Sequence, residues 1–366
     1  MFRDLDDKGQ SCSGCPRIPH ILAAATVKVR TGAVMSNFRK ILVTGGAGYV
    51  GSALVPKLLR DGYQVKVIDL YLYGEEVLHS VRASPNLTEI KGDIRDVELL
   101  KREVPGSDCV IHLACISNDP SYELDPELGK SINYDAFLDL VHVSGSNGVR
   151  RFIYASSSSV YGVKEVPEVT EDLPLEPLTD YSTYKAKCEE VLIAAASDDF
   201  VVTVIRPSTV CGYAPRLRLD LTVNILTNHA INKGEITVFG GDQKRPNIHI
   251  EDMTDLYLLL LKQPDHKIQK GIFNAGYQNH TVREIADIVA RTLGGGVTIK
   301  VTPTDDLRSY HVCSEKIRIT LGFEARHSIE EAVRDLKEAF DAGRIPDPLD
   351  DPRYYNIRTM QLAHLK

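Results

Sequence analysis

Short apolar runs alternate along this chain with longer segments in which apolar residues recur every three or four positions. A short apolar run bounded by turn residues is typical of a strand buried in a parallel sheet, whereas the longer spacing predicts a helix. Strands are predicted over 41–43, 64–68, 87–90, 109–113, 152–155, 201–205, 236–239 and 271–275. Helices are predicted over 49–60, 96–103, 126–146, 182–196, 222–233, 251–262, 282–293 and 328–342. This alternation predicts an α/β fold with a parallel sheet.

The turn between the first strand and the first helix carries three glycines, Gly45, Gly48 and Gly51, spaced three apart. Such spacing suits a tight turn whose backbone comes close to a ligand. The first N–H groups of the following helix have no partner within the helix and lie at the positive end of its dipole, which favours a pyrophosphate. Without further context, the same glycines also fit an ordinary strand-to-helix turn.

The second predicted strand ends on Asp69, eighteen residues after Gly51. A carboxylate at this position can accept hydrogen bonds from both ribose hydroxyls of an adenosine, and it repels a 2′-phosphate. Strand, glycine turn, helix, second strand and terminal carboxylate follow one another in the order of a dinucleotide-binding unit. The sequence therefore predicts NAD rather than NADP as the cofactor.

The extent of the alternation predicts a doubly wound parallel Rossmann sheet with a smaller mixed α/β substrate-binding lobe. The pattern loosens after Arg206–Pro207 and later returns, which suggests that the chain crosses to a second lobe and comes back. The chain then divides into an N-terminal extension that is expected to be disordered (1–37), an NAD-binding Rossmann domain (38–207, with returning segments at about 248–276), a substrate-binding lobe (208–247 and 277–345) and a C-terminal tail (346–366).

Composition excludes several classes of partner. The chain has 366 residues, 43% of them apolar, and a net charge of −7, so neither a nucleic acid nor an anionic membrane is expected to bind. No apolar run approaches the roughly 20 residues that span a bilayer, and no signal peptide is visible, so a cytoplasmic location is expected. The seven cysteines show no disulfide pattern, and the CxxC at Cys12 and Cys15 has no second pair or histidine cluster, so no metal is expected.

Tyr181 and Lys185 lie four residues apart at the start of a predicted helix, so both side chains project from one face. A tyrosine beside an ammonium group and an oxidised nicotinamide is expected to favour its phenolate form and to act as a base near neutral pH. The serine-rich run before Gly162 ends a buried strand, where its hydroxyls could hold a substrate oxygen. Taken separately, the two patterns also fit an exposed helix pair and a serine-rich turn.

Several further motifs accompany these residues, namely TGGAGYVGS, Gly92-Asp93-Ile94, His112-Leu113-Ala114, SSSVYG, YSTYK and the Arg206–Pro207 junction. Together with Asp69 they resemble the extended short-chain dehydrogenase/reductase family of nucleotide-sugar epimerases and dehydratases. The resemblance runs from about Phe38 to about Phe323. It implies a nucleotide-diphosphate sugar as substrate and, if the reaction is an epimerisation, a tightly held NAD that ends each cycle as it began.

The resemblance also assigns roles to single residues. Ser157 would hydrogen-bond the reacting sugar hydroxyl, Tyr181 would be the base and Lys185 would bind the nicotinamide ribose. The implied cofactor-binding residues are Gly45, Gly48, Tyr49, Val50, Gly51, Asp69, Asp93, Ile94, Leu113, Ala114, Tyr181 and Lys185. The implied substrate-binding residues are Ser157, Ser158, Thr209, Asn224, Arg245 and Arg308. Two arginines suit a diphosphate because their forks bind it bidentately, although each could equally form a surface salt bridge.

Ser158 and Ser159 limit which of the family's reactions is expected. The dehydratases of the family resemble one another in placing an acid just after the hydroxyl residue, because eliminating water across C5 and C6 needs a proton donor. Serine cannot serve as that acid, and a 3,5-epimerase would be expected to carry a cysteine where Ser159 stands. Epimerisation, most often at C4, needs only the tyrosine, the serine and NAD, since a hydroxyl is oxidised and the hydride returns to the other face.

Three alternatives remain open at this point. They are an NAD(P)-dependent nucleotide-sugar ketoreductase or dehydrogenase that consumes the cofactor, a 4,6-dehydratase, and a non-catalytic dinucleotide-binding protein. Thr209 stands where many family members have an asparagine, and Cys115 replaces a usual small alanine. Arg216 and Arg218 are additional arginines. These departures leave open a substrate other than UDP-glucose or UDP-galactose.

A homodimer is also expected, since a two-fold dimer is the commonest closed assembly. In related enzymes the two helices predicted over 126–146 and 182–196 pair across a two-fold axis. They carry the apolar residues Phe137, Leu140, Val191 and Leu192. The alternative is that these residues pack on the sheet of their own chain.

Overall fold

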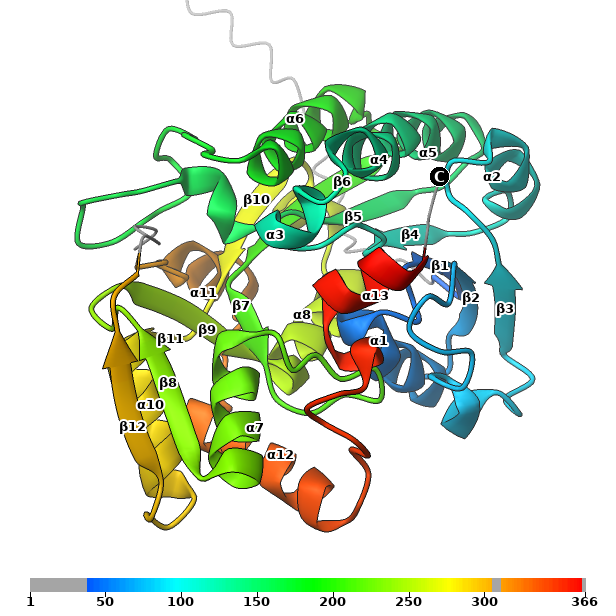
Figure 1. Cartoon of the computed structure of the whole chain (residues 1–366). Coiled ribbons are helices and arrows are strands. Elements are labelled where there is room, and N and C mark those ends of the chain that lie inside the picture. Colours follow the sequence, from blue (N-terminus) through cyan, green and yellow to red (C-terminus); the bar gives the residue numbers. More distant parts are fainter. Residues whose placement is uncertain (1–37, 305–310, 364–366) are drawn as a thin grey trace, which may run out of the picture. The chain divides into compact units, whose positions relative to one another are not determined.

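A parallel sheet forms the centre of the fold. The computed structural model describes residues 38–304 and 311–363, and within them seven parallel strands follow the order β10-β6-β5-β4-β1-β2-β3 (Figure 1). The strands are β1 (Lys40–Thr44), β2 (Gln64–Asp69), β3 (Leu87–Lys91), β4 (Cys109–His112), β5 (Arg151–Ala155), β6 (Val201–Pro207) and β10 (Gly271–Ala275). The predicted α/β fold with a doubly wound parallel sheet is confirmed.

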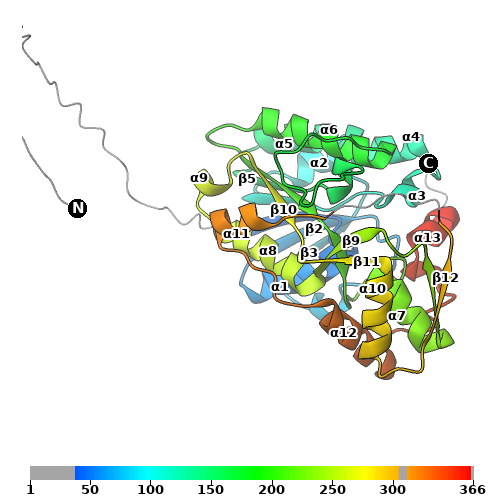
Figure 2. The same cartoon turned by 90° about the vertical axis from the view of Figure 1, so that its left-hand side faces the viewer.

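Helices cover both faces of this sheet, as Figure 2 shows. One face packs against α1 (Tyr49–Arg60), α8 (Ile250–Lys262), α9 (Asp265–Ile268) and α11 (Glu315–Leu321). The other packs against α2 (Val97–Glu103), α3 (Asp119–Tyr122), α4 (Pro126–Lys130), α5 (Ala136–Ser146) and α6 (Asp180–Ala195). Because the inner strands are buried on both faces, their sequences are continuous apolar runs.

The strand order reverses between β1 and β4, and this reversal opens a crevice at the carboxyl edge of the sheet. The chain leaves β1 toward β2 on one side, whereas β4 lies on the other side, so the loops at the carboxyl ends diverge and leave a crevice. Hydrogen bonds keep the strand ends level at this point. The N–H of Gly45 donates to the carbonyl of Ile68 at 2.9 Å, and the N–H of Leu113 donates to the carbonyl of Thr44 at 2.9 Å.

The smaller lobe has sheets and a core of its own. Within the described residues, β7 (Thr209–Cys211), β9 (Lys244–His249) and β11 (Gln278–Thr281) form one sheet, and β8 (Glu235–Phe239) pairs with β12 (Thr298–Thr302). The helices of the lobe are α7 (Thr222–Lys233), α10 (Val282–Thr292) and α12 (Ile329–Asp341), which share one apolar core. The hydrophobic pattern does not predict β7, β9, β11 and β12, because none of them is a continuous buried apolar run.

The helix predicted over 126–146 contains a π turn. After α4, residues Ser131–Asp135 form the π turn, and α5 continues the helix. The side chain of Asn133, within this turn, accepts from the N–H of Ile116 at 2.8 Å and donates to its carbonyl at 2.9 Å. The π turn therefore fixes the loop after β4, which lines the ligand site; such turns are frequent at functional sites.

The residues that supported the homodimer lie mostly in the core. Phe137, Leu140 and Leu192 are fully buried between the helices and the sheet. They consequently cannot form an exposed two-fold seam, and for these three residues packing on their own sheet is the arrangement found. The homodimer itself stays a prediction.

After α12 the chain returns to the large sheet. A 3₁₀ turn at Pro352–Tyr354 precedes α13 (Asn356–Ala363), which lies beside α3 in Figures 1 and 2. The segment expected to be a tail thus contains a helix that packs on the Rossmann part. Residues 1–37 and Arg308 lie outside the described residues, and the expectations for them stay predictions. None of the described helices combines the length and the apolar character that crossing a membrane demands.

A buried ion pair joins α6 to the sheet. Arg206, in β6, donates to the carboxylate of Glu189 in α6, with Nη2 to Oε2 at 2.6 Å and Nε to Oε1 at 3.0 Å. Both residues are only 3% exposed. The hydroxyl of Ser156 also donates to Glu189, at 2.5 Å, so the pair connects α6 to the serine-rich run. Removing one partner would leave the other as an unpaired buried charge.

We expect the Glu189→Ala substitution to lower the free energy of unfolding by about 3–5 kcal/mol, because it strands the Arg206 guanidinium in the core. Denaturant unfolding followed by circular dichroism measures the change. The matched control is Glu190→Ala, since Glu190 is the exposed neighbour on the same helix, and its effect should stay within about 0.5 kcal/mol. Equal stabilities of the two variants would contradict the expectation.

Candidate active site

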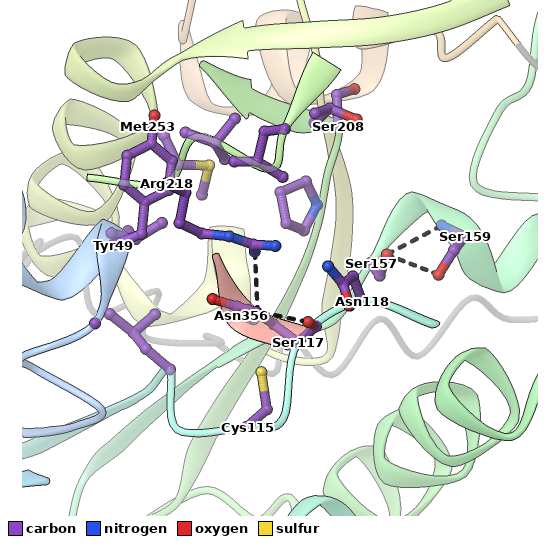
Figure 3. Close-up of a pocket in the computed structure, with 18 of the residues that line it drawn as sticks. Tyr49, Cys115, Ser117, Asn118, Ser157, Ser159, Ser208, Arg218, Met253 and Asn356 are labelled. Atoms are coloured by element: carbon purple, nitrogen blue, oxygen red, sulfur yellow. Dashed lines mark hydrogen bonds between the residues drawn. The ribbon is translucent and has the colours of Figure 1, made fainter. Parts of the chain in front are cut away.

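A cleft of about 410 Å³ opens at the carboxyl edge of the sheet. A smaller pocket of about 100 Å³ adjoins it, and both are lined by Gly45, Gly48, Tyr73 and Leu113. The cleft therefore continues into the smaller pocket past the glycine turn. Figure 3 shows side chains of the larger cleft, with the serines of the run after β5 on one side and Cys115 on another.

The glycine turn packs too closely against the neighbouring backbone to admit a side chain. Gly45 has φ +76°, and a Cβ there would lie 2.5 Å from the backbone nitrogen of Ala114. A Cβ on Gly51 would lie 2.5 Å from the carbonyl oxygen of Gly45. Gly48 precedes α1, and among the described residues no side chain caps that helix. The uncapped N–H groups at the positive end of α1 fit a pyrophosphate.

The smaller pocket brings together several of the residues predicted to bind the cofactor. It is lined by Asp69, Asp93, Ile94, Leu113 and Ala114. The carboxylate of Asp69 accepts from the N–H of Ala47 at 2.9 Å and from the N–H of Tyr71 at 2.8 Å. Burial raises the pKa of Asp69, and these two backbone hydrogen bonds oppose the rise. The donors also fix the carboxylate at the strand end, which is where a ribose diol would meet it.

Tyr181, Lys185 and Ser157 all line the larger cleft. Thr179 caps α6, so Tyr181 lies in the first helical turn and Lys185 one turn later. The ammonium of Lys185 donates to the carbonyl of Ala155 at 2.7 Å and lies 5.9 Å from the centre of the Tyr181 ring. Ser157 Oγ lies 2.8 Å from Ser159 Oγ and accepts from the N–H of Ser159 (Figure 3).

The acidity of Tyr181 depends on its burial and on several neighbouring groups. Burial raises the pKa of its phenol above the ordinary value, and nearby Cys115 and Asp119 raise it further. A hydrogen bond with Ser157 and the positive charge of Arg218 lower it, but by less. These protein groups together favour the neutral phenol. The phenolate expected from the sequence also depends on an oxidised nicotinamide beside the ring and stays a prediction. The burial of Tyr181 is a factor that a YxxxK motif does not reveal.

Most of the other predicted residues converge on the same cleft. Tyr49, Val50, Ser158, Thr209 and Arg245 all line it. Tyr49 nevertheless directs its hydroxyl to the carbonyl of Gly212, at 2.6 Å.

Asn224 is the exception among the described candidates, because it lines neither pocket. It is fully buried, and its amide accepts from the N–H of Gly212 at 3.0 Å and donates to the carbonyl of Arg218 at 2.8 Å. The amide thereby holds the loop that leads into α7. Arg308 lies outside the described residues.

The structure adds residues for which the sequence analysis assigns no role. Ser117, Asp220 and Asn356 line the larger cleft, and Met360 lines the smaller pocket. Asp220 pairs with Arg218 at 2.8 Å, and Arg218 also donates to Ser117 Oγ at 3.0 Å. The extra arginines of the loop after β7 were the available signal for this network. Nothing in the sequence pattern pointed to Asn356 or Met360.

Residues 41–276, more than half of the chain, match the NAD dependent epimerase/dehydratase family. The chain belongs to this family. The resemblance to nucleotide-sugar epimerases and dehydratases is thereby confirmed, as is NAD as the family's cofactor. The glycine turn, the uncapped α1 and the anchored Asp69 carboxylate fit such a dinucleotide.

Individual relatives extend the match beyond the family region. UDP-glucose 4-epimerase of Lactobacillus helveticus is 28% identical over 311 residues, covering 79% of this chain and 92% of that protein. The solved UDP-glucose 4-epimerase of Thermotoga maritima with UDP-glucose has 27% identity and a TM-score of 0.75, covering 83% of this chain and 99% of that one. The solved dTDP-glucose 4,6-dehydratase of Streptomyces venezuelae with NAD and TYD bound has 27% identity and a TM-score of 0.76, covering 85% of this chain and 100% of that one.

We expect Gly45→Ala to abolish the retention of NAD during purification, because the new Cβ would push the turn away from Ala114. The matched control is Gly62→Ala. Gly62 also has positive φ, +87°, but nothing lies within 4 Å of its Cβ position. Both variants carry similar backbone strain, of about 1–2 kcal/mol. The amount of bound nucleotide in each variant is measured by absorbance and chromatography. Equal NAD content in the two variants would contradict the role of the glycine turn in binding NAD.

Proposed function

We propose that this protein is an NAD-dependent nucleotide-sugar epimerase that inverts a sugar hydroxyl, at C4. One observation carries the proposal, namely that Ser157, Tyr181 and Lys185 line a cleft that continues into the glycine turn. Relatives named UDP-glucose 4-epimerase support the C4 position. A nucleotide-diphosphate sugar is the substrate class, and Arg245 lines the cleft where its diphosphate would need a cation.

In the proposed reaction, bound NAD supplies the acceptor and later the donor of a hydride. Tyr181, once ionised, removes the proton from the sugar hydroxyl, and Ser157 hydrogen-bonds the same oxygen and orients it. Lys185, held by the Ala155 carbonyl, stabilises the phenolate by its positive charge. Tyr181 then returns the proton to the oxygen once the keto sugar has presented its other face. The protein ends the cycle in its starting protonation state.

The acidic groups of the cleft favour epimerisation over dehydration. Ser158 and Ser159 supply no acid, and the carboxylates among the described lining residues are Asp119 and Asp220. Asp220 pairs with Arg218, and Asp119 accepts from the hydroxyl of Thr179 at 2.5 Å. Both carboxylates are thus already engaged in holding the walls of the cleft. An elimination would need one of them as a proton donor.

We expect the purified protein to interconvert a pair of sugar nucleotides that differ at C4, with no net change in absorbance at 340 nm. A screen of UDP-, GDP-, CDP- and dTDP-sugars read by NMR identifies the pair. Tyr181→Phe should lower the rate about 10²- to 10⁴-fold while NAD stays bound, because the ring remains and only the proton acceptor is lost. Stoichiometric consumption of NADPH would establish a reductase instead, and a 4-keto-6-deoxy product a dehydratase.

The pH dependence tests the role of Tyr181 separately. Since the base must be deprotonated, kcat/KM should rise with pH as Tyr181 ionises. Asp119→Asn removes a negative charge that raises the pKa of Tyr181, so the rise should move to lower pH. Ser157→Ala removes a hydrogen bond that lowers this pKa, so the rise should move to higher pH. Glu190→Gln, on the exposed side of α6, should leave the profile in place. Shifts of Asp119→Asn and Ser157→Ala in the same direction would refute the assignment.

A further inference from the structure

The helix α13, near the end of the chain, contributes to both parts of the ligand site. Asn356, its first residue, lines the larger cleft, and Met360, one turn later, lines the smaller pocket with Asp69 and Ile94. Residues four apart on a helix share a face. One face of α13 therefore closes the cleft and the dinucleotide pocket together.

Asn356 uses its hydrogen-bonding groups to join two loops of the site. It is 2% exposed. Its N–H donates to Asp220 Oδ2 at 2.9 Å, and its side-chain amide donates to Ser117 Oγ at 2.9 Å. Its side-chain oxygen accepts from Nη2 of Arg216. Figure 3 shows Asn356 next to Ser117, close to the side chain of Arg218.

Arg216 is the charged residue that Asn356 holds. It is 3% exposed, and its guanidinium stacks 3.5 Å from the centre of the Tyr73 ring. The direct contacts of Arg216, Asn356 and Tyr73, are neutral. Two carboxylates, Asp220 and Asp69, also act on its charge, but Asp220 is paired with Arg218 and Asp69 accepts from backbone N–H groups. Burial lowers the pKa of Arg216 to about 10, so its guanidinium remains charged at neutral pH. A buried charge whose direct contacts are neutral is stabilised further when an anion joins it.

The position of Arg216 points to the anion it serves. Its backbone N–H donates to Ser52 Oγ at 3.1 Å, and Ser52 lies in the first turn of α1. Arg216 and Tyr73 both line the cleft along with Gly48 and Val50, where the uncapped end of α1 is suited to a pyrophosphate. Nε of Arg216 is buried and has no hydrogen-bond partner among the described residues. A guanidinium fork with a spare donor suits a diphosphate.

We propose that α13 is a clasp of the cofactor site. Asn356 holds Arg216 against the pyrophosphate of the dinucleotide, and Met360 closes the adenosine end of the pocket. The proposal rests on the epimerase function in one respect, since the same cofactor must take the hydride and give it back. A dinucleotide that left between these two steps would strand the keto sugar, so slow release serves this chemistry.

The test measures how fast NAD leaves the purified holoprotein, with no sugar present. Release is followed by repeated desalting and by trapping free NAD with a coupled dehydrogenase. Asn356→Ala should release NAD roughly tenfold faster or more, because the guanidinium loses its support. Met360→Ala should also release it faster, by a smaller factor. Added NAD should restore activity to Asn356→Ala, and it should change nothing for the wild type.

Two variants of the same helix serve as controls. Thr359→Val removes a buried hydrogen bond, from Thr359 Oγ1 to the carbonyl of Pro352 at 2.7 Å, without touching either pocket. Leu362→Ala changes a side chain that is 64% exposed. Both should release NAD within about twofold of the wild type. If Thr359→Val released NAD as fast as Asn356→Ala, α13 would support the fold only and the clasp would be refuted.

Further variants test the clasp if Asn356→Ala does not fold. Arg216→Lys then takes its place, since lysine keeps the positive charge but loses the guanidinium fork and the stacking on Tyr73. Wild-type release rates in Arg216→Lys and Met360→Ala would overturn the proposal. A wild type that retains NAD but inverts no sugar would refute the epimerase function and leave the clasp standing. An active epimerase whose Asn356→Ala variant retains NAD would refute only the clasp.

Discussion

The site depends on the close approach of the glycine turn to the end of β4. A hydrogen at Gly45, where other residues carry Cβ, lets the turn after β1 lie against the backbone of Ala114. This contact falls where the strand order reverses, so it decides how the crevice at the sheet edge is shaped. The glycines, the start of α1 and the loop after β4 are then fixed as one surface. Side chains from α6, the loop after β7 and α13 are arranged around it.

Both burial and ion pairing determine the charges of the side chains in the cleft. Tyr181 is held as a phenol by burial and by Asp119, while Ser157 and Arg218 act in the opposite direction. Such a residue is a weak acid at rest and a strong base once ionised. Arg216 and Arg218 bring two positive charges beside the uncapped helix, and Asp220 balances one of them. An anionic ligand therefore completes the electrostatics of the site.

The sequence predicted the large sheet well because physical burial and pattern coincide there. The inner strands β1, β4, β5 and β6 are buried on both faces, and the sequences of such strands are apolar runs. The glycine turn and Asp69 could be placed from spacing, and Ser157, Tyr181 and Lys185 from their motifs. By contrast, β9 and β12 mix polar and apolar residues, so their pattern resembles that of loops. Asn356 and the burial of Tyr181 depend on contacts between distant segments, which periodicity does not encode.

The placement of β10 has a consequence for how this chain can fold and be divided. This edge strand pairs with β6, and Ile272 lies opposite Val204. In the sequence, however, the first segment of the smaller lobe lies between β6 and β10. Helix α8, which covers one face of the large sheet, also follows that segment. A fragment that stops at Pro207 would lack both an edge strand and the cover of one face, exposing apolar surface. A single cut in the chain therefore cannot separate the two lobes and leave the large sheet complete.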